Sequence, residues 1–570
     1  MYCGYTDASI KLREEVVTAR EHLSAALNRY AEISLKVRNC QRRGRPAGPD
    51  VVIFHSQDAQ LELRALIILE EKLQEAKINF TRALDLETTY ANPFHYPPTI
   101  NRLPQEILVR IFQLVQLVEP CELHLLDEHG HRGYPRYPDY LAQVCPHWRD
   151  IALASPYLWC HIDLSPHPEY EGSLLTRAKH HADRAGQLPL ELHIADADCT
   201  TAYDEGSDLQ RFLASIVGRI ISLQVYRTSW YIDGFETAVY EEIFRGGSGT
   251  LTELTVHSQS LDHAAFIEPT TEDNYDFEGL VTVDLSLEQI ERTLEHIQVL
   301  RLSELFPHWD SKAYHGLVDL RLASHCKTEA TQVSQSQFVT ILKASPGLRV
   351  LHFALQLTNV GQTDTPNPHA ILKYLEVLSV SMYGDGDGNN LSQVASVLRL
   401  ITPGSKPLRL TLQTGTYSDP SLLDTIKQFM LRSRISRFCA KKGAPPPYEL
   451  IECAPHLTDL VFDRCSYDLT SERLPIDLNH ASSSDSPIRL DSLHIHMSQF
   501  YSDDLRLVVG QYTTRSLVLS NCRVYDKASA PGEVSVAELV ASFAYLPQPL
   551  RFLTHEGLPP NPTACWNELD

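Results

Sequence analysis

Short apolar segments of one common form recur along most of this chain of 570 residues. They follow the pattern L-x-x-L-x-φ, where φ is an apolar residue, as in residues 317–322 (LVDLRL) and 348–353 (LRVLHF). The alternation of apolar and polar positions predicts β-strands, each with one buried face. Eleven similar strands restrict the fold more than any other feature of the sequence. The other nine segments are residues 188–194, 251–256, 297–302, 375–380, 408–412, 457–462, 490–495, 516–519 and 550–553.

Helix-like stretches separate many of these predicted strands, and many of the intervals from one strand to the next are near thirty residues. Four of the stretches begin with a serine or an asparagine, residue types that cap helix N-termini. These four predicted helices are residues 336–344, 390–401, 421–430 and 535–543.

One strand and one helix in a unit of this length are typical of a leucine-rich-repeat solenoid. The rival is a closed α/β domain with a parallel sheet, and the interval between segments does vary, from 20 residues (297 to 317) to 49 residues (408 to 457). A single doubly wound sheet rarely holds eleven strands. We therefore expect an irregular leucine-rich-repeat-like α/β solenoid over residues 185–558, followed by a C-terminal tail of residues 559–570.

The first ninety residues show helical periodicity. Apolar residues at alternating steps of four and three form one stripe from Leu12 to Val37, as in a coiled coil. A second stripe extends from Leu63 to Leu84, after a break rich in glycine and proline. We expect residues 1–90 to form a helical hairpin in which each stripe covers the other. The alternative, a homodimer through the first helix, is not favoured because the second stripe lies nearby.

The chain carries 72 acidic and 50 basic residues, a formal net charge of −22. Residues 1–90 are neutral, so the whole excess belongs to residues 91–570. Because phosphate binding requires clustered Lys and Arg, this excess argues against a nucleic-acid partner. It predicts an acidic repeat surface and, if the target protein is charged, a basic target.

The N-terminus has no unbroken apolar stretch, and nowhere do as many as about 18 apolar residues run together. We therefore expect neither a secretory signal nor a membrane span. The twelve cysteines are scattered without a CxxC pair, which is too sparse for a disulfide scaffold. These features predict an intracellular protein, cytoplasmic or nuclear, with no membrane partner.

Residues 103–112 (LPQEILVRIF) and 141–164 (LAQVCPHWRDIALASPYLWCHIDL) carry the most specific pattern in the sequence. Pro104 suits the first turn of a helix, and the apolar residues after it recur on one face. Pro146 is tolerable only in a first helical turn. Together the two segments resemble the F-box-like motif, in a form abundant in fungi, where L-P-x-E-I-L-x-x-I-F precedes V-C-x-x-W-R-x-x-A and P-x-L-W.

The resemblance implies a small helical F-box-like module over residues 96–164, within an α+β or α/β repeat fold. Such a module docks on the Skp-type adaptor of a cullin-RING ubiquitin ligase, while the rest of the chain captures a target protein. The resemblance therefore implies a recruiting subunit of the ligase and not an enzyme. The residues that would face the adaptor are Leu103, Pro104, Ile107, Leu108, Ile111, Phe112, Val144, Cys145 and Trp148.

These nine residues are expected to act by burial against a partner, since a few large apolar side chains can supply most of an interface's energy. No motif of a phosphate loop, dinucleotide fold, zinc protease or hydrolase elbow occurs. We therefore predict no catalytic residue, no cofactor and no metal. The alternative is a repeat scaffold for protein–protein interaction in which the F-box-like module is only structural.

Overall fold

The chain divides into two compact units, Met1–Arg110 and Ile111–Asp570, which are described separately. The predicted helical hairpin of residues 1–90 lies outside the described residues. The computed structural model describes residues 99–118, 136–165, 171–195, 208–227, 234–246, 249–258, 264–271, 280–324, 331–359, 369–381, 389–413, 420–442, 453–464, 489–511, 513–526, 534–544, 551–553, 563 and 566.

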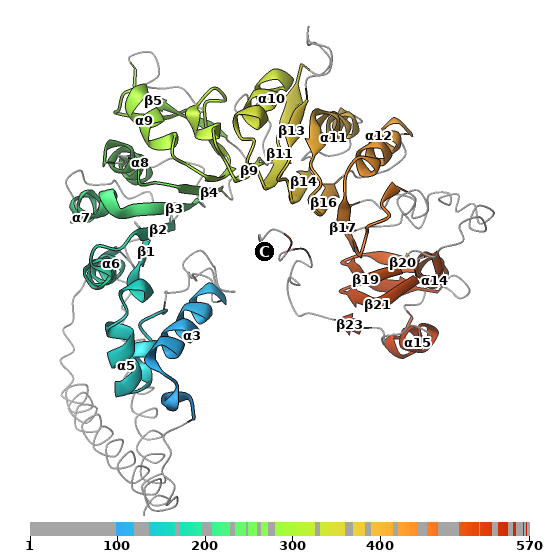
Figure 1. The fold of residues 1–570 in the computed structure, drawn as a ribbon, viewed down its shortest axis with the longest axis horizontal. Coiled ribbons are helices and arrows are strands. Elements are labelled where there is room, and N and C mark those ends of the chain that lie inside the picture. Colours follow the sequence, from blue (N-terminus) through green and yellow to red (C-terminus); the bar gives the residue numbers. More distant parts are fainter. Residues whose placement is uncertain are drawn as a thin grey trace, which may run out of the picture. The chain divides into compact units, whose positions relative to one another are not determined.

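A parallel sheet of fourteen strands runs through the second unit, and its strands follow one another in chain order (Figure 1). The predicted α/β character is therefore present as one long parallel sheet with helices between its strands. The strands are β1 (His161–Leu164), β2 (Leu190–Ala195), β3 (Ile220–Arg227), β4 (Glu253–Ser258), β7 (Val299–Ser303), β9 (Asp319–Ala323), β11 (Val350–Ala354), β14 (Val377–Ser381), β16 (Leu408–Gln413), β17 (Ile435–Lys441), β18 (Asp459–Asp463), β19 (Arg489–His496), β21 (Thr513–Ser520) and β23 (Arg551–Leu553).

All eleven predicted strands are found in this sheet, together with three that the leucine pattern does not predict: β1, β3 and β17. β3 and β17 keep the same spacing but begin with isoleucine, as IISLQV and ISRFCA. β17 lies inside the 49-residue interval from 408 to 457, so that long interval contains an additional strand of the sheet. β1 lies inside the segment assigned to the helical module.

One continuous row of apolar side chains crosses the sheet, because thirteen of its fourteen strands each contribute a residue in register with the neighbouring strand. Every member is at most 1% exposed. Full burial of such a side chain stabilises the fold by about 1.5–3 kcal/mol. The row consists of Ile162, Leu192, Leu223, Leu254, Leu300, Leu320, Leu351, Leu378, Leu410, Phe438, Leu460, Leu493 and Leu517.

Helices cover one side of this sheet (Figure 1). Three of them begin with a complete capping box, at Ser286, Ser334 and Ser535. The four predicted helices are present within two residues of their expected bounds, although Ser334 and not Ser336 caps the first of them. The helices are α6 (Glu171–Ala185), α7 (Asp208–Ile216), α8 (Gly234–Gly246), α9 (Leu287–Leu294), α10 (Gln335–Ala344), α11 (Asn389–Leu400), α12 (Pro420–Leu431), α14 (Ser502–Gln511) and α15 (Val536–Ser542).

Short parallel strands and 3₁₀ turns fill the connections of the second unit. Two 3₁₀ turns are η4 (Val217–Arg219) and η5 (Lys312–Tyr314). One three-stranded sheet joins β6 (Leu280–Val283), β5 (Ala265–Pro269) and β8 (Leu305–Pro307). The paired short strands are β10 (Gln332–Ser334) with β12 (Gln356–Thr358), β13 (Ala370–Leu372) with β15 (Ile401–Pro403), and β20 (Gln499–Tyr501) with β22 (Arg523–Tyr525).

Several strands of the long sheet end in a residue with positive φ, which turns the chain sharply. Each of these residues donates its backbone N–H to the last carbonyl of the next strand, as Arg464 does to His496 at 2.9 Å. A left-handed backbone is costly for residues other than glycine, so this hydrogen bond helps to hold it. The residues are Glu304, Lys442, Arg464, Met497 and Asn521.

A group of helices precedes the sheet in sequence. Among the helices within the described ranges, none combines the length and apolar composition that crossing a membrane requires. Pro146 is the first residue of its helix, as predicted. The elements are η1 (Thr99–Arg102), α3 (Gln105–Val118), α4 (Leu141–Val144), α5 (Pro146–Leu153) and η3 (Pro156–Trp159).

Candidate functional site

The start of α3, in the first unit, holds four of the predicted adaptor-facing residues. Pro104 directly precedes the helix, and its carbonyl accepts the backbone N–H groups of Ile107 and Leu108 at 3.0 and 3.1 Å. Pro104 and Ile107 are exposed, with 47% of Ile107 accessible. Leu103 is half-buried, whereas Leu108 is fully buried. Leu108 therefore has no surface to offer a partner in this structure.

The other five predicted residues lie in the second unit. The ring centroids of Phe112 and Trp148 are 4.9 Å apart, and Phe112 is only 1% exposed. Cys145 caps α5, because its Sγ accepts the backbone N–H of Trp148 at 3.4 Å. Val144 is 57% exposed, and Ile111 is half-buried. Phe112 is thus a core residue, while Val144 remains open to a partner.

Trp159 belongs to the chain's own core. It is fully buried, and its Nε1 donates to the carbonyl of Ala152 at 2.8 Å. The guanidinium of Arg184, in α6, lies 4.2 Å from the ring centroid. These contacts join the helical group to the first helix of the sheet region, so this tryptophan of the motif has a structural role.

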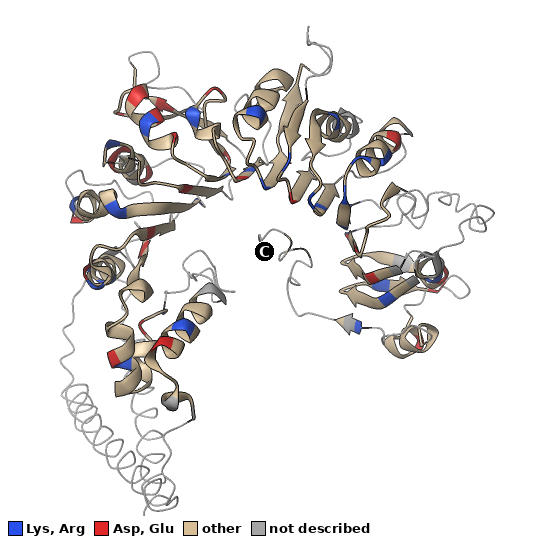
Figure 2. Ribbon diagram, viewed as in Figure 1, with Lys and Arg blue, Asp and Glu red and all other residues tan. Residues whose placement is uncertain are grey.

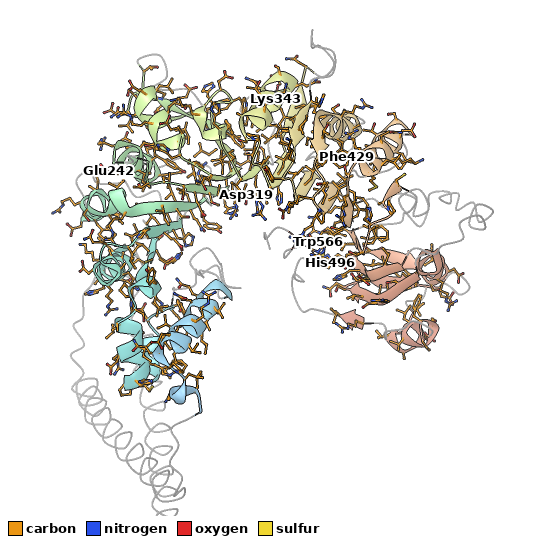
Figure 3. All side chains as sticks on the ribbon, in the orientation of Figure 1. Glu242, Asp319, Lys343, Phe429, His496 and Trp566 are labelled. Atoms are coloured by element: carbon orange, nitrogen blue, oxygen red, sulfur yellow. The ribbon has the colours of Figure 1, made fainter. Side chains whose placement is uncertain are left out.

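The side of the long sheet that the helices leave uncovered is a second candidate surface. Side chains alternate between the two faces of a strand, so the residues next to the buried apolar row, such as Asp319 beside Leu320, belong to the opposite face. We call the opposite side the open face; Figure 3 shows Asp319 on this side and Phe429 between α12 and the sheet. Its central row, in register from strand to strand, is Asp163, His193, Gln224, Thr255, Arg301, Arg321, His352, Ser379, Thr411, Cys439, Val461, His494 and Val518.

Basic residues outnumber acidic ones on the open face between β7 and β17 (Figure 2). Among the strand residues described there, Asp319 supplies the only carboxylate, and it pairs with Arg301 at 2.7 Å and Arg321 at 2.8 Å. The prediction of an acidic repeat surface is therefore wrong for this part of the sheet. The net charge of the chain could not predict this basic region, because the acidic residues lie in other parts of the chain. The basic residues are Arg301, Arg321, Arg409, Arg437 and Lys441.

The pKa of His352 depends on the charges of this basic region. Burial, together with the charges of Arg321, Lys441 and Arg301, lowers its pKa to about 3 against the opposing charge of Asp319. Its Nε2 atom is buried without a hydrogen-bond partner. The imidazole is therefore held neutral among positive charges.

Trp566, within the predicted tail, packs against the open face. It is 6% exposed and forms a buried cluster with Cys439 and Val461. Its carbonyl accepts Nη1 of Arg409 at 3.2 Å, and its ring lies under the guanidinium of Arg437, with 6.0 Å from Cζ to the centroid. Figure 3 labels this residue beside the strands. The tail thus supplies one apolar contact to the basic region.

A cluster of ionisable side chains lies at the start of the sheet, where nothing in the sequence predicted one. Asp163 is 1% exposed, and its Oδ2 accepts Nη1 of Arg177 at 2.7 Å. Its Oδ1 lies 3.0 Å from Nε2 of His161 and 3.2 Å from Nδ1 of His193. Burial raises the pKa of Asp163, but the charges and hydrogen bonds of the histidines outweigh it and hold the pKa well below its ordinary value. This carboxyl is ionised at neutral pH.

No family model matches the sequence, and no curated protein shows significant similarity to it. The functional interpretation therefore depends on these residues, their exposure and their contacts.

Proposed function

We propose that this protein is the target-recruiting subunit of a Skp-cullin-F-box type ubiquitin ligase. The observation that carries the proposal is the exposure of large apolar side chains in the helical segment. Of the thirteen such side chains in the described residues, six fall between residues 100 and 157. These six are close together in the sequence, and exposed large apolar side chains are typical of a protein interface. They are Ile100, Ile107, Leu114, Val144, Leu153 and Tyr157.

Two of the nine predicted adaptor-facing residues are too deeply buried to contact the adaptor. Leu108 and Phe112 stabilise the chain's own fold, since each is at most 1% exposed. The apolar side chains of the remaining residues enter the adaptor's groove, which is the usual way in which a helix is recognised. The adaptor-binding residues are then Leu103, Pro104, Ile107, Ile111, Val144, Cys145 and Trp148.

We infer that residues 185–558 form a leucine-rich-repeat-like α/β solenoid. Two observations support this: the chain order of the strands, and the buried apolar row, which has a member on twelve of the strands in this range. A doubly wound sheet instead reverses its strand order at a switch point. In a solenoid the open face is a continuous surface on which a target protein can lie.

The target contacts the basic region of the open face, between β7 and β17. Charge complementarity then favours a target segment rich in Asp and Glu, the reverse of the expectation from net charge. The mechanism is proximity: a target held beside a ubiquitin-charged enzyme, supplied by other subunits, reacts at a raised effective concentration. No covalent chemistry is required of this chain.

The adaptor half of the proposal is tested by co-expressing the full chain with a Skp-type adaptor and measuring the complex that co-purifies. Ile107→Glu introduces a charge at an exposed position of α3. At a central interface position such a change costs at least about 2 kcal/mol, a loss of about thirtyfold in affinity. Leu287→Glu is the matched control, because Leu287 is 57% exposed on α9, outside the helical segment.

The expected result is a complex with wild type and with the Leu287 variant, and little complex with the Ile107 variant. A wild-type chain that never co-purifies with the adaptor would exclude the ligase function and leave the non-ligase scaffold as the better reading. Equal binding by both variants would remove α3 from the interface.

A further inference from the structure

The cluster on β1 and β2 brings three metal-binding side chains together. The donor atoms, one each from His161, Asp163 and His193, all lie within 4.8 Å of one another. The two measured separations from Asp163 Oδ1 are 3.0 Å to His161 Nε2 and 3.2 Å to His193 Nδ1. Tetrahedral Zn²⁺, with bonds of about 2.0–2.1 Å, sets its ligand atoms about 3.3 Å apart. These two separations are close to that value, and the donor atoms of His161 and His193 lie within 4.8 Å of each other.

We propose that His161, Asp163 and His193 bind a Zn²⁺ ion. Two imidazoles and one carboxylate are ligands typical of zinc and not of calcium or magnesium, which prefer oxygen donors alone. The site is independent of adaptor binding and of the target.

The arrangement follows from the strands. His161 and Asp163 are two residues apart on β1, so their side chains share the open face. Asp163 is directly in register with His193 on β2, and neighbouring strands lie about 4.8 Å apart. The backbone therefore fixes all three ligands, and only small side-chain adjustments are needed to surround an ion.

Further side chains hold the ligands as outer-shell groups do in zinc sites, where a carboxylate orients the histidine and hydrogen bonds hold the ligating carboxylate. Oε2 of Glu191 lies 3.6 Å from Nδ1 of His161, while Nε2 of the same ring faces Oδ1 of Asp163, so the ring presents Nε2 to the centre of the cluster. Arg177 holds Oδ2 of Asp163 at 2.7 Å and leaves Oδ1 directed at the two histidines. The side chain of His161 is 24% exposed, which gives a water molecule access as the fourth ligand.

The charges of the cluster also suit a divalent cation. Asp139 and Asp163 pair with the one guanidinium of Arg177, and the carboxylate of Glu191 lies 3.6 Å from Nδ1 of His161. With neutral histidines, two negative charges are left unbalanced, and one Zn²⁺ ion neutralises them. The competing arrangement is a pair of protonated histidines without metal. A measurement of zinc binding therefore distinguishes a metal-bound cluster from a metal-free cluster with two protonated histidines.

The experiment is a Zn²⁺ titration of the full chain after treatment with chelator, with bound zinc measured by competition against a chromophoric chelator. The ligand variants are His161→Gln and His193→Gln, and His257→Gln on β4 is the matched control. We expect wild type and the control to bind one more zinc ion than either ligand variant. Glu191→Gln, whose side chain is 53% exposed, should weaken binding about tenfold. Co²⁺ in the wild-type site should give the visible absorption of a tetrahedral complex.

A wild-type chain that binds no more zinc than the ligand variants would overturn the proposal, and so would an octahedral Co²⁺ spectrum. Circular dichroism establishes whether the ligand variants are folded. If they are not, the exposed Glu191→Gln variant decides: unchanged zinc affinity there refutes the site. A rise in the wild-type melting temperature with Zn²⁺ that Glu191→Gln reduces would support it.

Discussion

Replacing His352 with glutamine should remove part of the acid sensitivity of this protein. The folded chain holds the imidazole neutral, because burial and the charges of Arg321, Lys441 and Arg301 lower its pKa to about 3. The unfolded chain exposes the ring, whose pKa then returns to about 6.5. A glutamine of similar size has no proton to gain in either state.

The change in the free energy of unfolding with pH follows from the difference between the folded and unfolded pKa values of His352. Because the folded pKa is depressed, the contribution to stability is fully present above about pH 6.5 and is lost as pH falls towards 3. Between pH 7 and pH 5 the unfolded state gains most of a proton that the folded state does not bind. The free energy of unfolding should fall by about 2 kcal/mol through His352 alone.

The assay is urea unfolding of the full chain at pH 7 and pH 5, followed by tryptophan fluorescence and circular dichroism. The wild-type loss between the two pH values should exceed that of His352→Gln by about 2 kcal/mol. His456→Gln is the control, because His456 is exposed in the turn before β18. An equal loss in wild type and His352→Gln would show that the ring is not held neutral, and would refute the argument.

Three further outcomes are expected. Leu320→Ala should cost about 2–5 kcal/mol in urea unfolding, because this leucine is fully buried in the apolar row; a loss under about 1 kcal/mol would mean that the row packs loosely. Arg464→Gly should raise the unfolding free energy by about 1 kcal/mol, since φ at this position is 53° and glycine adopts it without strain; destabilisation would contradict this reasoning. Trp566→Ala should make Cys439, which is fully buried beside it, reactive towards a maleimide, with the modified peptide identified by mass spectrometry. An unreactive Cys439 would show that other residues cover it.

Much of the sheet could be predicted because the alternation of apolar and polar residues along a strand shows which of its faces is buried. A leucine at every second or third position marks the buried face, and all eleven segments so marked are strands of the long sheet. The leucine pattern did not predict β3 and β17, because isoleucine, phenylalanine or alanine occupies some of the leucine positions in these strands. Any apolar side chain of suitable size satisfies burial, so a motif restricted to leucine was too narrow.

The helical segment was less predictable at the level of single residues. Ile107 and Leu108 are adjacent in one apolar stretch, yet 47% of the first is exposed and none of the second. Periodicity defines an apolar stripe on a helix but not which edge of the stripe a neighbour covers. That choice depends on the elements packed against α3, and it decides which side chains remain for a partner.

The sequence by itself determined the α/β character, the strands of the leucine pattern and four of the helices, because these depend on residues close together in the chain. Only the tertiary structure decided what the open face contains. Burial of the apolar row fixes the register between strands. That register places Asp163 beside His193 and gathers five basic residues between β7 and β17 of a chain with net charge −22. The net charge of a chain does not show where its charged residues lie on the folded surface. The proposed zinc site and the proposed acidic target therefore both depend on strand pairing.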